Sequence, residues 1–355
     1  MARDRIHGVA LNEFALIDVL RAHCTHVRGD VALGIGDDAA VLGVPAGRQL
    51  VACTDTLVAG VHFLADTAPG DIGWKSLAVN LSDLAAMGAE PAWAMLALTL
   101  PQADKRFVEA FAQGFAEFAN AHDVALVGGD TTQGPLSITV TALGFVPARQ
   151  ALTRAGARAG DAVFVTGTLG DAAGALRLLR DRDLGQSHLP PQEERRRAAT
   201  GGCGAADSGL QAERTQLLGR LDRPQPRVAA GLALRGIATA CIDVSDGLLA
   251  DLGHVCAMSG VAAEIHVDAL PLSAALSATF DAATCRELAL TGGDDYELCF
   301  TVPETRIAEI VEKLGRAGCG VTRIGRIVAG AGVRALDVRG NVVTPQRAGW
   351  EHFTP

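Results

Sequence analysis

The segment KSLAVNLSDLAAMGAEPAWAMLALTLP (75–101) decides the fold of the first half of the chain. Apolar residues recur at helical spacing over 70–88, and the stretch 92–100, AWAMLALTL, is apolar almost throughout. Such a run is typical of a buried strand rather than an edge strand. The segment therefore predicts a helix followed by a buried strand, in a protein that mixes both kinds of element.

Helical and β-rich patterns alternate outward from this segment, which predicts the fold class α+β / α/β. We expect one domain at 1–148 and a second, α/β domain at 149–355. Residues 182–209 contain Pro190-Pro191 and the charged run QEERRRAA, so we expect a solvated or flexible insertion there. Further helices are expected at 12–27, 104–121, 170–181 and 304–318, and strands at 50–60, 123–130, 135–147, 162–167, 264–268 and 297–302, with a strand entering a helix at 239–252.

Composition excludes several classes of protein. The 355 residues include 31 Lys and Arg against 40 Asp and Glu, and this net charge of −9 argues against a nucleic-acid binder. No apolar run reaches the length of a membrane span, and the N-terminus lacks the apolar region of a secretory signal. The eight cysteines form no CxxC pair and are typical of reduced thiols, so we expect a cytoplasmic protein.

Small residues stand beside aspartates at six turns, most of them after an apolar strand. Taken singly, each turn is explained by helix capping or ordinary turn chemistry. Together they are harder to dismiss, because turns at strand ends are where such proteins collect functional groups. The turns are Gly36-Asp37-Asp38, Thr54-Asp55-Thr56, Leu81-Ser82-Asp83, Gly128-Gly129-Asp130-Thr131-Thr132, Asp243-Val244-Ser245-Asp246-Gly247 and Gly292-Gly293-Asp294-Asp295.

Converging carboxylates would repel one another and would require cations. Oxygen ligands without His or Cys suit hard ions, so Mg²⁺ or Mn²⁺ is expected, and Mg²⁺ held by aspartate typically bridges substrate phosphates. Gly-Gly turns let backbone N–H groups approach phosphate oxygens. The pattern therefore indicates nucleotide-phosphate chemistry through several metal ions.

Two other phosphate-binding motifs fit poorly, and no catalytic nucleophile stands out. The stretch 34–39 matches GxGxxA with Asp55 about 20 residues on, but it leads into a β-like segment instead of a helix. A dinucleotide-dependent oxidoreductase therefore remains a remote alternative. The Gly73-Trp74-Lys75-Ser76 segment lacks the Walker spacing, and no His follows a GxSxG element. We expect no covalent catalytic residue.

The chain resembles bacterial thiamine-monophosphate kinases, of the superfamily that includes aminoimidazole-ribonucleotide synthetase and selenophosphate synthetase. The resemblance rests on LGIGDDAAVL (33–42), TDTLVAGVHF (54–63), the 75–101 segment, LVGGDTTQGPLSIT (126–139), LTRAGARAGD (152–161), IDVSDGLLADLGH (242–254) and GGDDYELCFTVP (292–303). It implies a two-domain fold in which N-terminal sheets pair across a homodimer. It also implies ATP-dependent phosphorylation of thiamine monophosphate to thiamine diphosphate.

The resemblance also implies roles for individual residues. Mg²⁺ ions would be held by Asp38, Thr54, Asp55, Asp83, Asp130, Asp243 and Asp246. ATP would contact Gly129, Asp130, Arg154 and Ser245. The thiamine substrate would face His62, Asp294 and Trp350.

Two departures from the family pattern and two further alternatives bear on this assignment. Cys53 stands where relatives carry Ser or Thr, and a neutral thiol is a poor Mg²⁺ ligand. Asp294 stands where relatives carry Glu, which shortens its reach by one methylene. Another ATP-dependent synthetase of the superfamily and a non-catalytic metal-binding scaffold are the alternatives. The apolar stretches 92–100 and 137–145 favour burial between two subunits, which the resemblance also implies.

Overall fold

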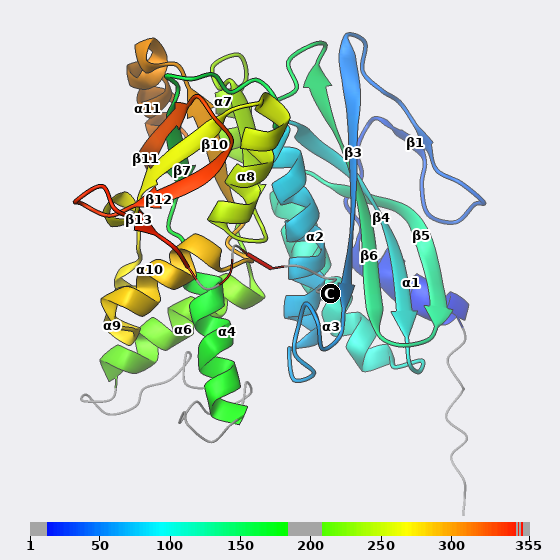
Figure 1. The fold of residues 1–355 in the computed structure, drawn as a ribbon. Coiled ribbons are helices and arrows are strands. Elements are labelled where there is room, and N and C mark those ends of the chain that lie inside the picture. The colour runs from blue at the N-terminus through cyan, green and yellow to red at the C-terminus, as the bar shows by residue number, and fades with distance from the viewer. Residues whose placement is uncertain (1–12, 184–207, 346, 348, 351–355) are drawn as a thin grey trace, which may run out of the picture. The chain divides into compact units, whose positions relative to one another are not determined.

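The computed structural model describes residues 13–183, 208–345, 347, 349 and 350 (Figure 1). By its contacts the chain divides into two compact units. Unit 1 comprises Met1–Pro45, Thr54–Leu77 and Ala92–Ala142, and unit 2 comprises Ala46–Cys53, Ala78–Pro91 and Leu143–Pro355. The domain boundary near residue 148 stays a prediction, and most of the stretch 182–209 lies outside the described residues.

A four-stranded sheet forms the centre of the N-terminal half, in the order β3-β6-β4-β5. Its strands are β3 (Arg48–Val58), β6 (Ser137–Pro147), β4 (Glu90–Leu100) and β5 (Ala125–Gln133). The helices of this half are α1 (Glu13–His23), α2 (Pro69–Ala86) and α3 (Lys105–Ala121). The 75–101 segment thus folds as predicted, into the end of α2 followed by β4.

Helix α3 packs a stripe of phenylalanine side chains into the core. Phe111, Phe115 and Phe118 are fully buried. The helix starts at Asp104, whose carboxylate accepts the backbone N–H groups of Arg106 and Phe107. Such capping satisfies donors that a helix start leaves unpaired.

The strands of this sheet differ in how far the chain itself covers them. Strand β4 is mostly buried, so its apolar character needs no partner subunit. Strand β6 instead alternates between buried and half-buried residues up to Gly144, as expected of a strand with one covered face. One face of β6 is thus only partly covered by the chain itself, and burial of 137–145 between two subunits stays a prediction.

The GxGxxA stretch does not open a helix. It lies between β1 (Val31–Leu33) and β2 (Val41–Leu42), which pair antiparallel. A dinucleotide site needs a helix N-terminus at this point to receive the pyrophosphate. The structure therefore argues against the oxidoreductase alternative.

Unit 2 contains a seven-stranded sheet in the order β13-β12-β9-β11-β7-β10-β8. Its strands are β7 (Ala162–Thr166), β8 (Ala240–Val244), β9 (Ala262–His266), β10 (Glu297–Val302), β11 (Val321–Val328), β12 (Gly332–Leu336) and β13 (Val342–Val343). Strand β12 runs parallel to β9, and the other recorded pairs are antiparallel. The helices are α4 (Asp171–Asp183), α6 (Ser208–Asp222), α7 (Val228–Leu234), α8 (Leu248–Ser259), α9 (Ala274–Thr279), α10 (Ala282–Thr291) and α11 (Ile307–Arg316), and short 3₁₀ turns span Val267–Ala269 and Glu304–Arg306.

Both faces of the seven-stranded sheet are covered. Every residue of β7, β8 and β10 is buried, as their near-continuous apolar sequences predict. Residues of α8 and α10 pack on one face, and residues of α7 and α11 pack on the other. Strands buried on both sides hold the turns beside them in fixed positions, and the predicted residues Ser245, Asp246 and Asp294 lie on such turns.

Membrane insertion finds no support in the described helices. None of them combines the length and the apolar character needed to cross a bilayer.

Candidate functional site

Asp243 is the next-to-last residue of strand β8 and is almost fully buried. Its Oδ2 accepts a hydrogen bond from the Ser82 hydroxyl at 2.7 Å, and Ser82 is itself buried in α2. Burial raises the pKa of Asp243, while the bond from Ser82 and the charge of Arg154 oppose that rise. The contact ties Asp243 to the predicted Leu81-Ser82-Asp83 segment, which lies within helix α2 and not at a turn as the sequence predicted.

The turn that follows β8 is shaped by Asp251, which the sequence analysis did not single out. Its Oδ2 accepts the backbone N–H groups of Ser245, Asp246 and Gly247 at 3.0, 3.1 and 3.1 Å. Burial, together with the charges of Asp243 and Asp246, raises the pKa of Asp251 to about 7. The sequence does carry a signal for this role, because Asp251 is an acidic residue in the first turn of the helix that follows Asp246-Gly247.

The Gly292-Asp295 turn packs against the turn after β8. The Asp294 N–H donates to the Ser245 carbonyl at 2.9 Å, and the Tyr296 N–H donates to the Val244 carbonyl at 2.9 Å. A Cβ on Gly293 would lie 2.4 Å from the Ser245 carbonyl oxygen, so this close approach requires glycine. The Gly-Gly pair here serves packing between two turns.

Asp294 itself is held in an unusual backbone conformation. Its backbone φ angle is 67° and that of Tyr296 is 50°, values that residues other than glycine rarely adopt. The Tyr296 hydroxyl donates to Asp294 Oδ1 at 2.8 Å, which orients the carboxylate.

Trp350 reaches the same turn from the end of the chain. Its backbone N–H donates to the Asp246 carbonyl at 2.9 Å, and 44% of the residue is exposed. The structure thus brings four predicted residues around one loop: Ser245, Asp246, Asp294 and Trp350.

The predicted residues of unit 1 lie on or beside the four-stranded sheet. The hydroxyls of Thr54 on β3 and Thr141 on β6 are 2.8 Å apart, and half-buried Asp55 follows Thr54. Asp130 is exposed on β5 beside Ala97 of β4. A Cβ on Gly129 would lie 1.8 Å from the Leu96 carbonyl oxygen, and its φ is 150°, so the strand geometry before Asp130 requires glycine.

His62 is fixed by its own turn. Its Nδ1 accepts the Val58 N–H at 3.0 Å, so the neutral ring carries its proton on Nε2. The buried Lys75 donates from Nζ to the His62 carbonyl at 3.3 Å.

Asp38 and Cys53 complete the predicted set. Asp38 is exposed, and its N–H donates to Asp37 Oδ1 at 2.9 Å. The Cys53 thiol donates to the Asn80 carbonyl at 3.3 Å, which gives it a structural partner.

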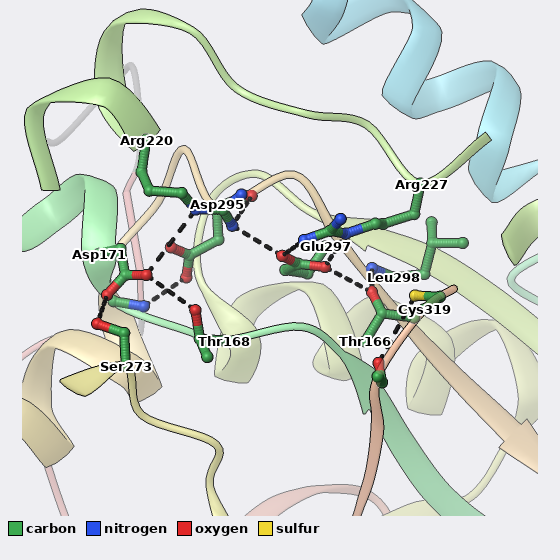
Figure 2. A network of polar contacts seen from close by, with 12 residues as sticks. Thr166, Thr168, Asp171, Arg220, Arg227, Ser273, Asp295, Glu297, Leu298 and Cys319 are labelled. Atoms are coloured by element: carbon green, nitrogen blue, oxygen red, sulfur yellow. Dashed lines mark hydrogen bonds and ion pairs between the residues drawn. The ribbon is translucent and has the colours of Figure 1, made fainter. Parts of the chain in front are cut away.

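A buried charge network lies next to Asp294 and escaped the sequence analysis (Figure 2). Its carboxylates are Asp171, Asp295 and Glu297, which are 1, 2 and 0% exposed, and its cations are Arg220 and Arg227. The sequence carries a signal for this network, because Glu297 begins the otherwise apolar strand ELCFTV and a buried charge needs a partner of opposite charge.

Comparisons with known proteins identify the family. The model for the N-terminal domain of AIR synthase related proteins matches residues 36–146, and the model for their C-terminal domain matches 158–338. Thiamine-monophosphate kinase of Salmonella typhimurium is 45% identical over 347 residues, which is 97% of this chain and 99% of that protein. The chain belongs to the thiamine-monophosphate kinase family. This confirms the family and the two-domain fold class that the motifs predict.

Solved structures of the family agree with this assignment. The crystal structure of thiamine-monophosphate kinase from Stenotrophomonas maltophilia K279a is 50% identical, with a TM-score of 0.80, and covers 94% of this chain and 99% of that chain. AaThiL complexed with AMPPCP and TMP is 32% identical, with a TM-score of 0.71, and covers 98% and 100% of the two chains.

Within this family member, the predicted metal ligands are divided between the units. Asp38, Thr54, Asp55 and Asp130 belong to unit 1, whereas Asp83, Asp243 and Asp246 belong to unit 2. Across the described ranges, no three His, Cys, Asp or Glu side chains form a ready metal site. The assignment of these ligands stays a prediction.

Proposed function

We propose that this chain transfers the γ-phosphoryl group of ATP to thiamine monophosphate and releases thiamine diphosphate. The observation that carries the proposal is family membership across nearly the whole chain, together with a relative solved with AMPPCP and TMP. The grouping of Ser245, Asp246, Asp294 and Trp350 around one loop adds independent support.

The loop after β8 offers the chemistry that thiamine monophosphate requires. The substrate carries a permanent thiazolium cation, and Asp294 supplies a carboxylate oriented by Tyr296. Trp350 supplies a partly exposed indole, and a cation over an indole gains about 0.5–2 kcal/mol. His62, the third residue assigned to the substrate, belongs to unit 1 and carries an Nε2–H donor in the tautomer that its turn selects.

The carboxylates of unit 2 fit a divalent cation. Burial raises the pKa values of Asp243 and Asp251, the charge of Asp246 raises both further, and Asp243 also raises that of Asp251, so negative charge gathers around the turn. Mg²⁺ commonly binds through one or two carboxylates and keeps its remaining positions for water and phosphates. A site of that kind needs no preformed cage of three protein ligands. The residues proposed to hold Mg²⁺ are Asp38, Thr54, Asp55, Asp83, Asp130, Asp243 and Asp246.

The reaction requires positioning more than proton transfer. When bound, Mg²⁺ neutralises charge that develops on the phosphates. The acceptor phosphate is already ionised at neutral pH, so no strong base is needed. Gly129, Asp130, Arg154 and Ser245 are assigned to ATP, and the substrate residues hold the acceptor in line with the γ-phosphorus. A direct transfer of this kind inverts a chiral γ-phosphorus, and retention would overturn the mechanism.

The decisive assay supplies purified full-length protein with ATP, Mg²⁺ and thiamine monophosphate and measures thiamine diphosphate directly. Formation of the diphosphate that depends on both ATP and Mg²⁺ is expected. ATP consumption without thiamine diphosphate would favour another synthetase of the superfamily. No ATP turnover would favour a metal-binding scaffold.

We extend the proposal to a homodimer formed through the four-stranded sheet. Leu50 on β3 is 44% exposed and Met95 on β4 is 43% exposed, although both lie within a sheet. A second copy of this sheet would cover such residues. Light scattering at micromolar concentration is expected to give twice the chain mass, and a monomer would contradict the proposal.

A further inference from the structure

The buried carboxylate of Glu297 is satisfied from three sides. Arg227 donates from Nε to Oε2 at 2.6 Å and from Nη2 to Oε1 at 2.5 Å. Arg220 donates from Nη2 to Oε1 at 2.7 Å, and the Thr166 hydroxyl donates to Oε2 at 2.7 Å. Two guanidinium groups therefore share one carboxylate at the start of β10.

Arg220 differs from Arg227 because it also contacts the turn that carries Asp294. Its Nη2 donates to the Asp295 carbonyl at 3.3 Å, and its Nε lies 3.8 Å from Asp171 Oδ2 (Figure 2). Within the described part of the chain, the hydrogen bonds of the Arg227 guanidinium go to Glu297 alone. Arg220 thus connects the strand, the turn and the start of α4.

The 294–296 turn has an unfavourable backbone conformation that its neighbours must hold in place. Asp294 and Tyr296 both have positive φ, and Asp295 lies between them. On one side, the carbonyls of Val244 and Ser245 accept backbone N–H groups of this turn. On the other side, Asp295 Oδ2 accepts the Gly170 N–H at 2.8 Å, and Arg220 holds the Asp295 carbonyl. A strained backbone persists only where its surroundings determine it in this way.

We propose that Arg220 is a positioning residue for the substrate: by holding the Asp295 carbonyl, it fixes the Asp294 carboxylate toward thiamine monophosphate. This inference rests on the proposed function for its substrate and on the described contacts for its geometry. Arg220 does not touch the substrate in this account. It acts through the backbone of the 294–296 turn and through the hydrogen bond between Tyr296 and Asp294.

Arg227 provides the matched control. Arg220→Gln and Arg227→Gln each remove one guanidinium from the same buried Glu297, so both lower stability through the same carboxylate. Only Arg220→Gln also removes the donor to the Asp295 carbonyl. A structural role alone predicts that the two variants behave alike.

Tyr296 gives a readout that does not depend on catalysis, because it is the only tyrosine in the chain. Labelling the full-length protein with ring-¹³C tyrosine yields one ring environment, next to the hydrogen bond that orients Asp294. The experiment records this NMR signal and the KM values for thiamine monophosphate and ATP in the wild type and both Gln variants.

We expect Arg220→Gln to shift or broaden the Tyr296 signal and to raise the KM for thiamine monophosphate about tenfold. Its KM for ATP should stay within about twofold. Arg227→Gln should keep the wild-type signal and both KM values. Equal effects of the two variants, or an unchanged signal in Arg220→Gln, would overturn the inference.

Two controls keep the test decisive. If a Gln variant does not fold, Arg220→Lys and Arg227→Lys replace the pair, because lysine keeps the charge but lacks the planar fork that reaches two acceptors. The same contrast is then required. If the wild type does not phosphorylate thiamine monophosphate, the proposed function fails, and the Tyr296 signal alone decides the positioning role.

Discussion

Ser82→Ala isolates the hydrogen bond that supports Asp243. The Ser82 hydroxyl lies 2.7 Å from Asp243 Oδ2, and the two residues are 0 and 4% exposed, so water does not replace the lost donor. Leaving a buried carboxylate without one donor costs about 1–3 kcal/mol. We expect the free energy of unfolding without ligands to fall by about 2 kcal/mol.

Ser76→Ala is the matched control on the same helix. Ser76 is also buried in α2, but its hydroxyl donates to the Gly73 carbonyl at 2.9 Å, within the helix itself. Both substitutions gain the higher helix propensity of alanine, about 0.5 kcal/mol, so their difference reports the Asp243 contact. Thermal unfolding should place Ser82→Ala several degrees below Ser76→Ala, at roughly 2–4 °C per kcal/mol.

A functional readout separates this contact from ordinary core packing. The bond from Ser82 opposes the raised pKa of Asp243, so its loss raises that pKa further and leaves less carboxylate to bind a cation. Ser82→Ala should therefore need more Mg²⁺ for half-maximal activity at neutral pH, and this requirement should fall as pH rises. If the two serine variants share one Mg²⁺ requirement and one melting temperature, the role assigned to Ser82 is refuted.

Three further substitutions test other parts of the site. Burial raises the pKa of Asp295 well above 3.8, so folding takes up a proton and the stability of the wild type falls as pH rises from about 4. Asp295→Asn removes this loss, so its denaturation midpoint should change less with pH than that of the wild type. An equal pH dependence in both proteins would show that Asp295 is ionised when folded. Trp350→Ala keeps the backbone bond to Asp246 and should raise the KM for thiamine monophosphate roughly tenfold without changing that for ATP, whereas equal effects on both would indicate an anchoring role. Asp130→Asn changes an exposed residue and should lower kcat about 100-fold or more at unchanged melting temperature, and a destabilised variant would mark Asp130 as structural.

The sequence predicted the elements that carry strong periodicity or unbroken apolar runs. Strand β4, helix α3 and strands β7, β8 and β10 lie where those patterns place them, because burial on one or both faces leaves a direct mark on composition. The turn after β8 was also predictable, since Asp243, Ser245 and Asp246 stand together in one motif.

The partners of buried charges were not predictable, because they are set by tertiary contacts. Glu297 is marked as unusual by its place in an apolar strand, yet nothing local selects its partners among 31 lysines and arginines. Arg220 lies 77 positions away, in a helix whose sequence, SGLQAERTQLLGRLD, shows no clear apolar face. The capping role of Asp251 is equally hidden, since a single acidic residue in a first helical turn has many ordinary explanations.

The charge network also joins α4 and α6 to the Asp294 turn. Asp171 begins α4 and Arg220 stands in the last turn of α6, so the network holds the start of one helix and the end of the other. At 1.5 Å per residue, the 13 residues of α4 separate Asp171 from the other end of that helix by about 20 Å. A similar length of α6 lies between Ser208 and Arg220. The Asp294 turn is therefore held at the start of α4 and the end of α6, through the contacts of Gly170 and Arg220 with Asp295.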